Sequence, residues 1–227
     1  MEKGYRHEYK YLISRSAATL LRLRLPHIME RDKHAGLSGE YTIRSLYFDD
    51  FSYTAMDDKL SGIREREKYR IRYYNYDDGL IKLERKEKIG HLTRKTACTI
   101  TKADALALQT CLFEGCPDTA VRLTEDLRLG ITGRGLRPKV LVDYDRTPFI
   151  CRDGNTRITI DDNLRTRPYC TDLFASHEAM QRVIPHDQVI LEVKFDDFLP
   201  AYLHDALKDI PRVNMAISKF ALCLDLT

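Results

Sequence analysis

The segment from Tyr69 to Lys88 constrains the fold more than any other, because it alternates apolar and charged residues on both sides of a turn signal at Asp77-Asp78-Gly79. This pattern predicts a β-hairpin. Successive side chains of a strand point to opposite faces, so the hairpin has an apolar face and a charged face. The apolar face would carry Ile71, Tyr73, Ile81 and Leu83, and the charged face would carry Arg70, Arg72, Tyr74, Lys82, Glu84 and Lys86.

The charged face of this hairpin has two interpretations. In an ordinary antiparallel sheet, the apolar face packs on a core and the charged face lies in water. Alternatively, the charged face binds an anion, because cations on adjacent strands repel one another unless negative charge lies between them. The other strands decide between these interpretations.

The rest of the sequence repeats the same pattern. In the segment 156–162, for example, Arg157, Thr159 and Asp161 oppose Ile158 and Ile160. Further strands are expected at 6–13, 41–49, 91–100, 139–149 and 189–195, and helices at 14–25, 51–60, 103–113, 118–129, 200–210 and 217–226. In at least five strands, one face is thus apolar and the other face carries Arg, Lys or Glu.

These strands and helices predict an α+β fold with an antiparallel β-barrel. Amphipathic helices must cover the apolar face of the sheet, so the charged faces turn toward one another around a polar lumen. The lumen would be lined by Lys10, Arg70, Arg72, Lys82, Lys86, Arg146, Arg157 and Lys194, offset by Glu8, Glu84, Glu192 and Asp161. Such a lumen repels itself when empty and therefore indicates a multiply charged anion as ligand.

The composition limits the other function classes. The chain has 227 residues, enough for one domain spanning 1–227, and its 37 basic against 34 acidic residues give a net charge of only +3. The overall charge therefore does not indicate nucleic-acid binding, and the aromatic residues form no stacking platform for single strands.

The cellular location is also predicted from the sequence. The six cysteines form no C-x-x-C pair and are typical of reduced thiols. The first residues, MEKGYRHEYKYLI, lack the apolar region of a signal peptide, and no apolar run reaches the about 18 residues of a membrane span. We expect a cytoplasmic protein.

Eight short motifs together resemble the VTC-type polyphosphate polymerase domain of the triphosphate tunnel metalloenzyme (CYTH-like) superfamily. They are EYKY (8–11), RSLYFDD (44–50), YRIRYYN (69–75), IKLERKEK (81–88), VDYDRTPF (142–149), RITIDDNLR (157–165), VILEVKF (189–195) and ISKF (217–220). The resemblance implies an eight-stranded antiparallel tunnel that binds polyphosphate or a nucleoside triphosphate together with a divalent metal ion.

The resemblance also implies roles for individual residues. It assigns phosphate binding to Lys10, Arg70, Arg72, Lys82, Lys86, Lys95, Tyr144, Arg146, Arg157, Lys194, Ser218 and Lys219. The catalytic set is Lys10, Arg70, Arg72, Lys86, Arg146, Arg157 and Glu192. Glu192, with Glu8, would bind Mn²⁺ or Mg²⁺, because a hard cation on phosphates prefers one or two carboxylates.

Two assignments stay open at this point. Glu84 could bind metal, but a salt bridge to neighbouring lysines is the better interpretation. Arg94 could replace Lys95, because a register slip of one residue exchanges the two faces of a strand.

The expected activity is transfer of the γ-phosphate of a nucleoside triphosphate, ATP in our expectation, to a growing polyphosphate chain. Two alternatives are triphosphate hydrolysis and a non-catalytic polyphosphate-binding sensor or scaffold. Related hydrolases begin with E-x-E-x-K, and Arg6 stands at the first of these glutamates, which argues against hydrolysis. The expected partners are a nucleoside triphosphate, polyphosphate or pyrophosphate, and a membrane protein on a separate chain that supplies the membrane helices of eukaryotic VTC proteins.

Overall fold

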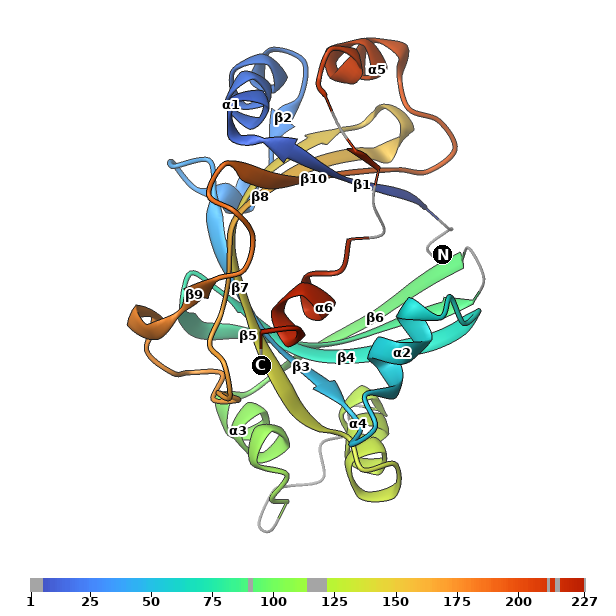
Figure 1. The fold of residues 1–227 in the computed structure, drawn as a ribbon, viewed down its shortest axis with the longest axis vertical. Coiled ribbons are helices and arrows are strands. Elements are labelled where there is room, and N and C mark those ends of the chain that lie inside the picture. Colours follow the sequence, from blue (N-terminus) through green and yellow to red (C-terminus); the bar gives the residue numbers. More distant parts are fainter. Residues whose placement is uncertain (1–5, 90–91, 114–121, 212, 215–216, 227) are drawn as a thin grey trace. The chain divides into compact units, whose positions relative to one another are not determined.

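The computed structural model describes residues 6–89, 92–113, 122–211, 213–214 and 217–226 as a mixed α+β fold (Figure 1). The helices are α1 (Arg15–Arg24), α2 (Thr54–Leu60), α3 (Lys102–Thr110), α4 (Arg122–Gly133), α5 (Ala201–Lys208) and α6 (Lys219–Leu224). The strands are β1 (His7–Ser14), β2 (Glu30–Arg31), β3 (Tyr41–Asp49), β4 (Glu65–Tyr74), β5 (Asp77–Ile89), β6 (Leu92–Ile100), β7 (Arg137–Cys151), β8 (Thr156–Thr166), β9 (Gln181–Arg182), β10 (Gln188–Phe195) and β11 (Val213–Asn214). None of the helices in this part of the chain has the length and apolar character that crossing a bilayer requires.

The strands form a large antiparallel sheet, and each predicted strand is present with bounds that differ by a few residues. The hydrogen-bonded order is β11-β1-β10-β8-β7-β3-β4-β5-β6, with β2 on β7 and β9 on β8. Eight of these strands have 8 to 15 residues, and β2, β9 and β11 have two each. Among the described residues the order does not return to its first strand, so closure into a barrel stays a prediction.

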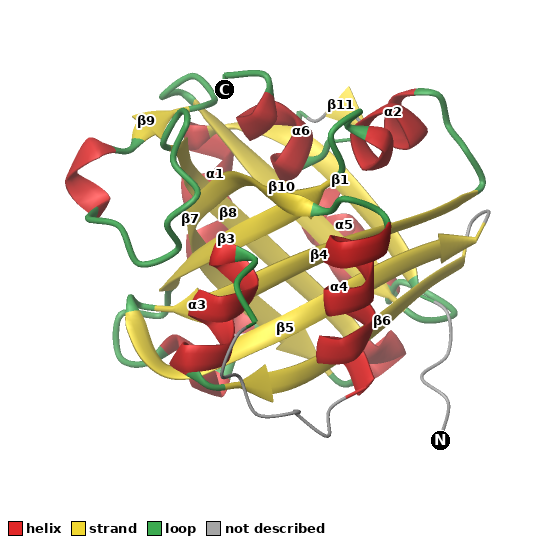
Figure 2. Ribbon diagram, turned by 90° about the horizontal axis from the view of Figure 1, so that it is seen from below, coloured by secondary structure: helices red, strands yellow, loops and turns green. Residues whose placement is uncertain are grey.

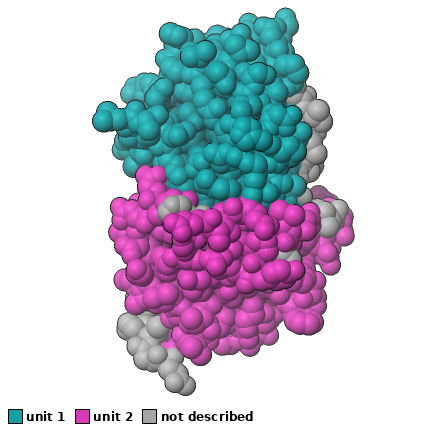
Figure 3. Space-filling model, turned by 60° about the vertical axis from the view of Figure 1, so that its left-hand side comes forward, with its two compact units in different colours: residues 1–42, 143–165, 182–222 teal, residues 43–142, 166–181, 223–227 magenta. Residues whose placement is uncertain are grey.

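The chain divides into two compact units, each assembled from segments far apart in the sequence (Figure 3). Unit 1 contains residues 1–42, 143–165 and 182–222, and unit 2 contains residues 43–142, 166–181 and 223–227. Strand β7 contributes residues to both units. The single domain expected from the sequence stays a prediction.

The core of unit 1 lies between the apolar face of its strands and the helices α1 and α5 (Figure 1). Ile158 and Ile160 of β8 are fully buried there together with Leu21 of α1 and Leu203 of α5. Helix α1 is capped by Ser14, one of two candidates in the sequence with Ser16, because the Ser14 hydroxyl accepts from the backbone N–H of residue 17 at 3.1 Å. The apolar alternation thus decides which face of the sheet is covered.

Unit 2 follows the same construction with helices α3 and α4, which cross the apolar face of β5 (Figure 2). Ile71 of β4 and Leu83 of β5 pair directly across the hairpin and are fully buried. Leu108 of α3 and Leu127 of α4 complete this core. The apolar face predicted for the central hairpin is confirmed.

The turn of the central hairpin lies two residues earlier than the sequence predicted. Asn75 and Tyr76 form the turn with φ of 52° and 57°, and Asp77 already pairs with Tyr74. A two-residue hairpin turn of type I′ needs positive φ at both central residues, which asparagine adopts readily. The Asp77-Asp78-Gly79 segment instead forms the start of β5. The register between β4 and β5 shifts there, between Arg72 and Tyr74 of β4.

Helix α4 does not end at residue 129, as the sequence predicted, but continues through Gly130 to Gly133. A Cβ atom at Gly130 would lie 2.6 Å from Cδ1 of Leu136. Gly130 is therefore a packing position inside the helix and not its end. Residues 118–121 of the predicted helix lie outside the described residues.

Ile71→Ala should lower the free energy of unfolding by about 2–5 kcal/mol, because the removed groups lie in a fully packed core. Denaturant unfolding of the purified chain measures this loss. Leu80→Ala on the same hairpin is the control, since its side chain is 45% exposed and should cost well under about 1 kcal/mol. Equal losses for the two variants would contradict the assignment of the faces.

Candidate functional site

The unit 2 charged face consists of the side chains that alternate with the core residues of β4, β5 and β6. Strand register places Arg70 opposite Glu84 and Arg72 opposite Lys82. In the strand register, Lys86 lies opposite Lys68 of β4 on one side and opposite Lys95 of β6 on the other. The face predicted from the sequence is therefore present, with Arg70, Arg72, Lys82, Glu84, Lys86 and Lys95 on it.

Glu84 is the buried centre of the unit 2 charged face, with 2% of its surface exposed. Its Oε2 accepts from Nη2 and Nε of Arg70 at 2.6 and 2.7 Å, and its Oε1 lies 2.5 Å from Nζ of Lys95. Nη1 of Arg72 lies 3.9 Å away. Burial alone would raise the pKa of Glu84, but these three cations hold it well below its usual range. The salt-bridge role predicted for Glu84 is confirmed. Its partners are Arg70, Arg72 and Lys95.

Two hydroxyl groups on β3 extend the cluster around Glu84. The sequence analysis did not identify them. The Tyr47 hydroxyl accepts from Nη1 of Arg70 at 2.6 Å, and the Ser45 hydroxyl accepts from Nε of Arg72 at 2.9 Å. The signal was available, because Ser45 and Tyr47 alternate with the buried Leu46 and Phe48 in the motif RSLYFDD. These hydroxyls fix the direction of both guanidinium groups.

Lys95, and not Arg94, shares the face of Glu84. Arg94 pairs with Glu87 on the opposite face, with Nε 2.9 Å from Oε2. About half of the Lys95 side chain is exposed, at 48%, yet burial of its ammonium group lowers its pKa to about 8. Glu84 opposes this shift, and the nearby Arg70 and Arg72 add to it. Lys95 therefore changes charge close to neutral pH.

The unit 1 charged face is built in the same way on β1, β10 and β8. Register places Lys10 opposite Glu192, and Glu192 opposite Thr159. In the next row, Glu8 lies opposite Lys194, which lies opposite Arg157. Acidic and basic residues are thus interspersed on this face, and each acidic residue of β1 and β10 has a basic residue opposite it.

Glu192 is the buried centre of the unit 1 charged face, with 4% of its surface exposed. Its oxygens lie 3.1 Å from Nζ of Lys194, 3.6 Å from Nζ of Lys10 and 3.6 Å from Nη2 of Arg146. Burial alone would raise the pKa of Glu192, but Lys194, Lys10, Lys219 and Arg146 hold it well below its usual range. Glu192 is therefore a carboxylate at neutral pH.

Asp161 organises the other part of this face. It accepts two hydrogen bonds from Arg146, at 2.6 and 2.7 Å, and lies 2.6 Å from Nζ of Lys219. The ring of Tyr144 lies beneath both cations, 5.3 Å from Cζ of Arg146 and 4.9 Å from Nζ of Lys219. Tyr144 thus contacts both cations of the cluster through its ring.

Two predicted phosphate-binding residues have other contacts. Arg157 donates to Asp32 at 2.9 Å and to the Tyr41 hydroxyl at 3.1 Å, partners that no local pattern indicated. The Ser218 hydroxyl accepts from the backbone N–H of residue 221 at 3.3 Å, at the start of α6. Both side chains belong to unit 1.

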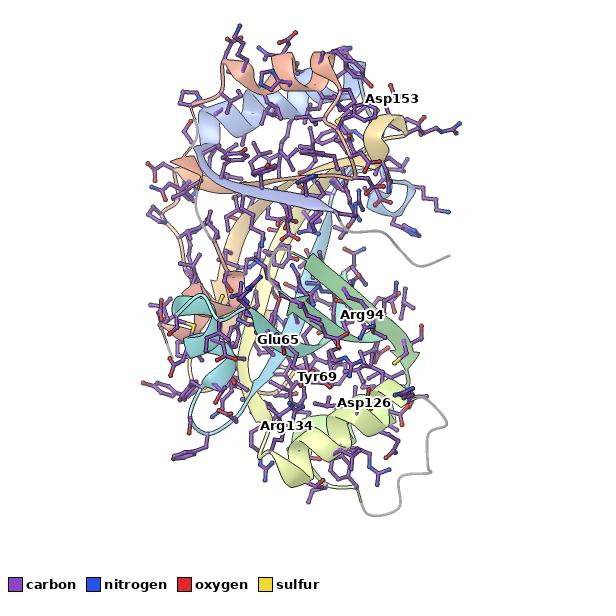
Figure 4. All side chains as sticks on the ribbon, turned by 90° about the vertical axis from the view of Figure 1, so that its right-hand side faces the viewer. Glu65, Tyr69, Arg94, Asp126, Arg134 and Asp153 are labelled. Atoms are coloured by element: carbon purple, nitrogen blue, oxygen red, sulfur yellow. The ribbon has the colours of Figure 1, made fainter. Side chains whose placement is uncertain are left out.

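The apolar side of unit 2 carries an open pocket of about 380 Å³ beside α4 (Figure 4). It is lined by Glu67, Tyr69, Arg85, Asp126, Leu129, Gly130 and Arg134. Arg85 lies 2.9 Å from Asp126, and Arg134 lies 2.5 Å from Glu67. Each arginine is neutralised by a carboxylate, so this pocket lacks the excess of cations found on the charged face.

The carboxylates of unit 1 allow a limited metal-binding role. In the part of the chain that the structure describes, no three His, Cys, Asp or Glu side chains gather as a metal site. Glu8 and Glu192 nevertheless contact the same two lysines, Lys10 and Lys194. This donor set fits a hard cation that takes most of its ligands from phosphate oxygens and one or two from carboxylates.

The two charged faces differ in charge balance. In unit 2, the cations Arg70, Arg72 and Lys95 contact the carboxylate of Glu84, and Lys82 and Lys86 lie on the same face of β5. In unit 1, the cations Lys10, Arg146, Lys194 and Lys219 contact the carboxylates of Glu8, Asp161 and Glu192. Forked guanidinium donors and lysine point charges suit the oxygens of phosphate groups. Both faces can therefore bind a polyanion.

Comparison with known proteins gives a family match and a fold match. The family model described as "VTC domain" matches residues 5–227. A crystal structure called "putative adenylate cyclase" from Bacillus halodurans is similar with a TM-score of 0.54 and 17% identity, over 92% of this chain and 90% of that one. A structure from Pyrococcus horikoshii has a TM-score of 0.49 and 10% identity, over 96% and 99%. No curated protein matches the sequence.

Glu84→Gln should lower the free energy of unfolding by up to about 3 kcal/mol, because the uncharged amide leaves several cations facing one another. Partial exposure of Arg70 and Lys95 keeps the loss below that of a fully buried pair. Inorganic tripolyphosphate should bind this variant more tightly and restore its melting temperature. Thermal unfolding with and without tripolyphosphate measures both effects.

Glu87→Gln is the matched control, since Glu87 pairs with Arg85 and Arg94 on the opposite face of the same strand. Its melting temperature should rise with tripolyphosphate by the same amount as that of the wild type. If tripolyphosphate rescues both variants equally, Glu84 has no special relation to the anion.

Tripolyphosphate affinity should fall as the pH rises through about 8, because Lys95 loses its positive charge there. Lys95→Arg keeps its charge throughout and should show a flatter profile between pH 7 and about 9. Calorimetric titrations of both proteins against the same ligand cancel the titration of tripolyphosphate itself. Parallel profiles for the two proteins would show that Lys95 does not contact the anion.

Proposed function

Because the chain belongs to the VTC domain family, we propose that it is a metal-dependent polyphosphate polymerase. It would transfer the γ-phosphate of ATP to a growing polyphosphate chain. The observation that supports this most is the unit 2 charged face, where Arg70, Arg72 and Lys95 all lie within 4 Å of the one buried carboxylate of Glu84. Such an excess of charge is costly unless a polyanion neutralises it.

Phosphoryl transfer needs positioning and neutralisation more than covalent help from the protein. Arg70 and Arg72 would each hold phosphate oxygens with two donors, in directions fixed by Tyr47 and Ser45. Lys82, Lys86 and Lys95 would add point charges along the same strands. A phosphate chain would thus meet a donor at each step along the hairpin.

The unit 1 charged face would act on the reacting phosphates. Arg146 and Lys219 would stabilise charge on the transferred group, held in place by Asp161. Glu192, with Glu8, would hold Mn²⁺ or Mg²⁺, and the metal ion would neutralise part of the negative charge of the phosphate groups when bound. The low pKa of Glu192 keeps this carboxylate ionised for that role.

We further propose that the eight longer strands close into the tunnel implied by the family resemblance. This proposal is supported by the helices α1, α3, α4 and α5, which cover the apolar faces. In each unit the charged face is the side of the sheet opposite these helices. A closed tunnel would keep water away from the phosphates along most of the chain.

The second candidate is a non-catalytic polyphosphate-binding module. It is favoured by the small number of carboxylates, since no group of three metal-binding side chains occurs among the described residues. Hydrolysis is less well supported, because Arg6 pairs with Asp196 at 2.9 Å where related hydrolases have a first glutamate. The three activities give different products, which separates them.

With ATP and Mn²⁺, the purified chain should release ADP and form polyphosphate, with one ADP for each phosphate added. Glu192→Gln should lower this turnover at least about 10-fold while tripolyphosphate binding is kept, because loss of a direct metal ligand costs at least as much as loss of a residue that only orients one. Chromatography of nucleotides and gel analysis of polyphosphate measure the products. Glu87→Gln, on the opposite face of unit 2, should retain the activity.

Two results would contradict the proposal. Free phosphate without polymer would indicate a hydrolase. Tight polyphosphate binding without ADP release, unchanged by Glu192→Gln, would indicate a binding module.

A further inference from the structure

Thr159 carries a buried hydroxyl that has no assigned role on the unit 1 charged face. Its side chain lies in β8 with 2% of the residue exposed, and within the described part of the chain its Oγ1 has no hydrogen-bond partner. Native structures rarely leave a buried hydroxyl unpaired, because the loss of its bonds to water is not compensated. The hydroxyl therefore indicates a partner outside the protein chain.

The position of Thr159 directs this hydroxyl toward the charged cluster. On β8 it alternates with Ile158 and Ile160, which are buried in the core beneath α1 and α5. Directly across the sheet it faces Glu192 on β10 and Pro148 on β7. The proline ring offers no hydrogen-bonding group on that side.

The charged groups near Thr159 already form ion pairs with one another. The oxygens of Glu192 lie near three cations, and those of Asp161 are bound by Arg146 and Lys219. An unused O–H group beside several cations fits an anionic oxygen, which accepts a hydrogen bond from it. A hydroxyl also adds a donor to this face without adding repulsion when no ligand is present.

We propose that the Thr159 hydroxyl donates a hydrogen bond to a non-bridging phosphate oxygen of the triphosphate or polyphosphate held by unit 1. This inference rests on the proposed function of the chain. It adds an uncharged hydrogen-bond donor to a site whose other proposed phosphate-binding groups are cations. Thr159 would position the phosphate that lies over Glu192, between Lys10 and Arg146.

The test compares Thr159→Val, which removes the hydroxyl and keeps the shape, with Thr159→Ser, which keeps the hydroxyl. Calorimetry with inorganic tripolyphosphate should show at least about a tenfold loss of affinity for the valine variant, or about 1.4 kcal/mol. The serine variant should bind within about threefold of the wild type. Without ligand, the melting temperature of the valine variant should equal or exceed that of the wild type, because an unpaired buried hydroxyl is removed.

Thr156→Val is the control on the same strand. Thr156 is equally buried, faces the opposite side and donates to the backbone oxygen of Asp153 at 2.9 Å. This variant should lower the melting temperature and leave tripolyphosphate affinity unchanged. If Thr159→Val does not fold, Thr159→Ala against Thr159→Ser makes the same comparison.

Three outcomes would overturn the inference. Wild-type affinity in the valine variant would show that the hydroxyl does not contact phosphate. A lower melting temperature of Thr159→Val without ligand, restored in Thr159→Ser, would show that the hydroxyl has a structural partner instead. If the wild type itself does not bind tripolyphosphate, the proposed function fails first, and the inference fails with it.

Discussion

The charged faces of this protein depend on a few buried carboxylates that neutralise several cations at once. Glu84 contacts three cations in unit 2, and Glu192 contacts three in unit 1. Charges that are partly removed from water interact strongly, so without these carboxylates the cations would repel one another across the strands. A phosphate group that binds beside them offers the same kind of negative oxygen. The carboxylates therefore stabilise the protein without a bound anion and would compete with the proposed phosphate ligand.

The two units use this arrangement to different extents. In unit 1, each of Glu8, Asp161 and Glu192 contacts at least two of four cations, so that charge is nearly balanced. In unit 2, three cations, Arg70, Arg72 and Lys95, share the single carboxylate of Glu84. A face with excess positive charge gains most from a polyanion, whereas a balanced face keeps carboxylates for a hard cation. Binding a phosphate chain and holding a metal ion are thus supported by different parts of the chain.

Strand alternation predicted the charged faces from the sequence because a period of two needs no knowledge of distant segments. The assignment of Arg70, Arg72 and Glu84 to one face follows from this period alone. The pairing partners do not, since the contact of Arg157 with Asp32 joins residues 125 positions apart. The turn was misplaced for another reason: Asn75 and Tyr76 adopt positive φ, while the stronger turn motif lies next to them within β5.

The apolar core explains why the charged side chains can be placed accurately at all. A shift of β8 by one residue would move Asp161 and Thr159 into the core and bring Ile158 and Ile160 onto the charged face. The cost of burying those polar groups fixes the register of the strand. Because the donors stand on a strand whose register is fixed in this way, little of the binding energy of the proposed phosphate ligand would be spent on ordering them. The covered apolar face would thus contribute to the proposed site without touching the ligand.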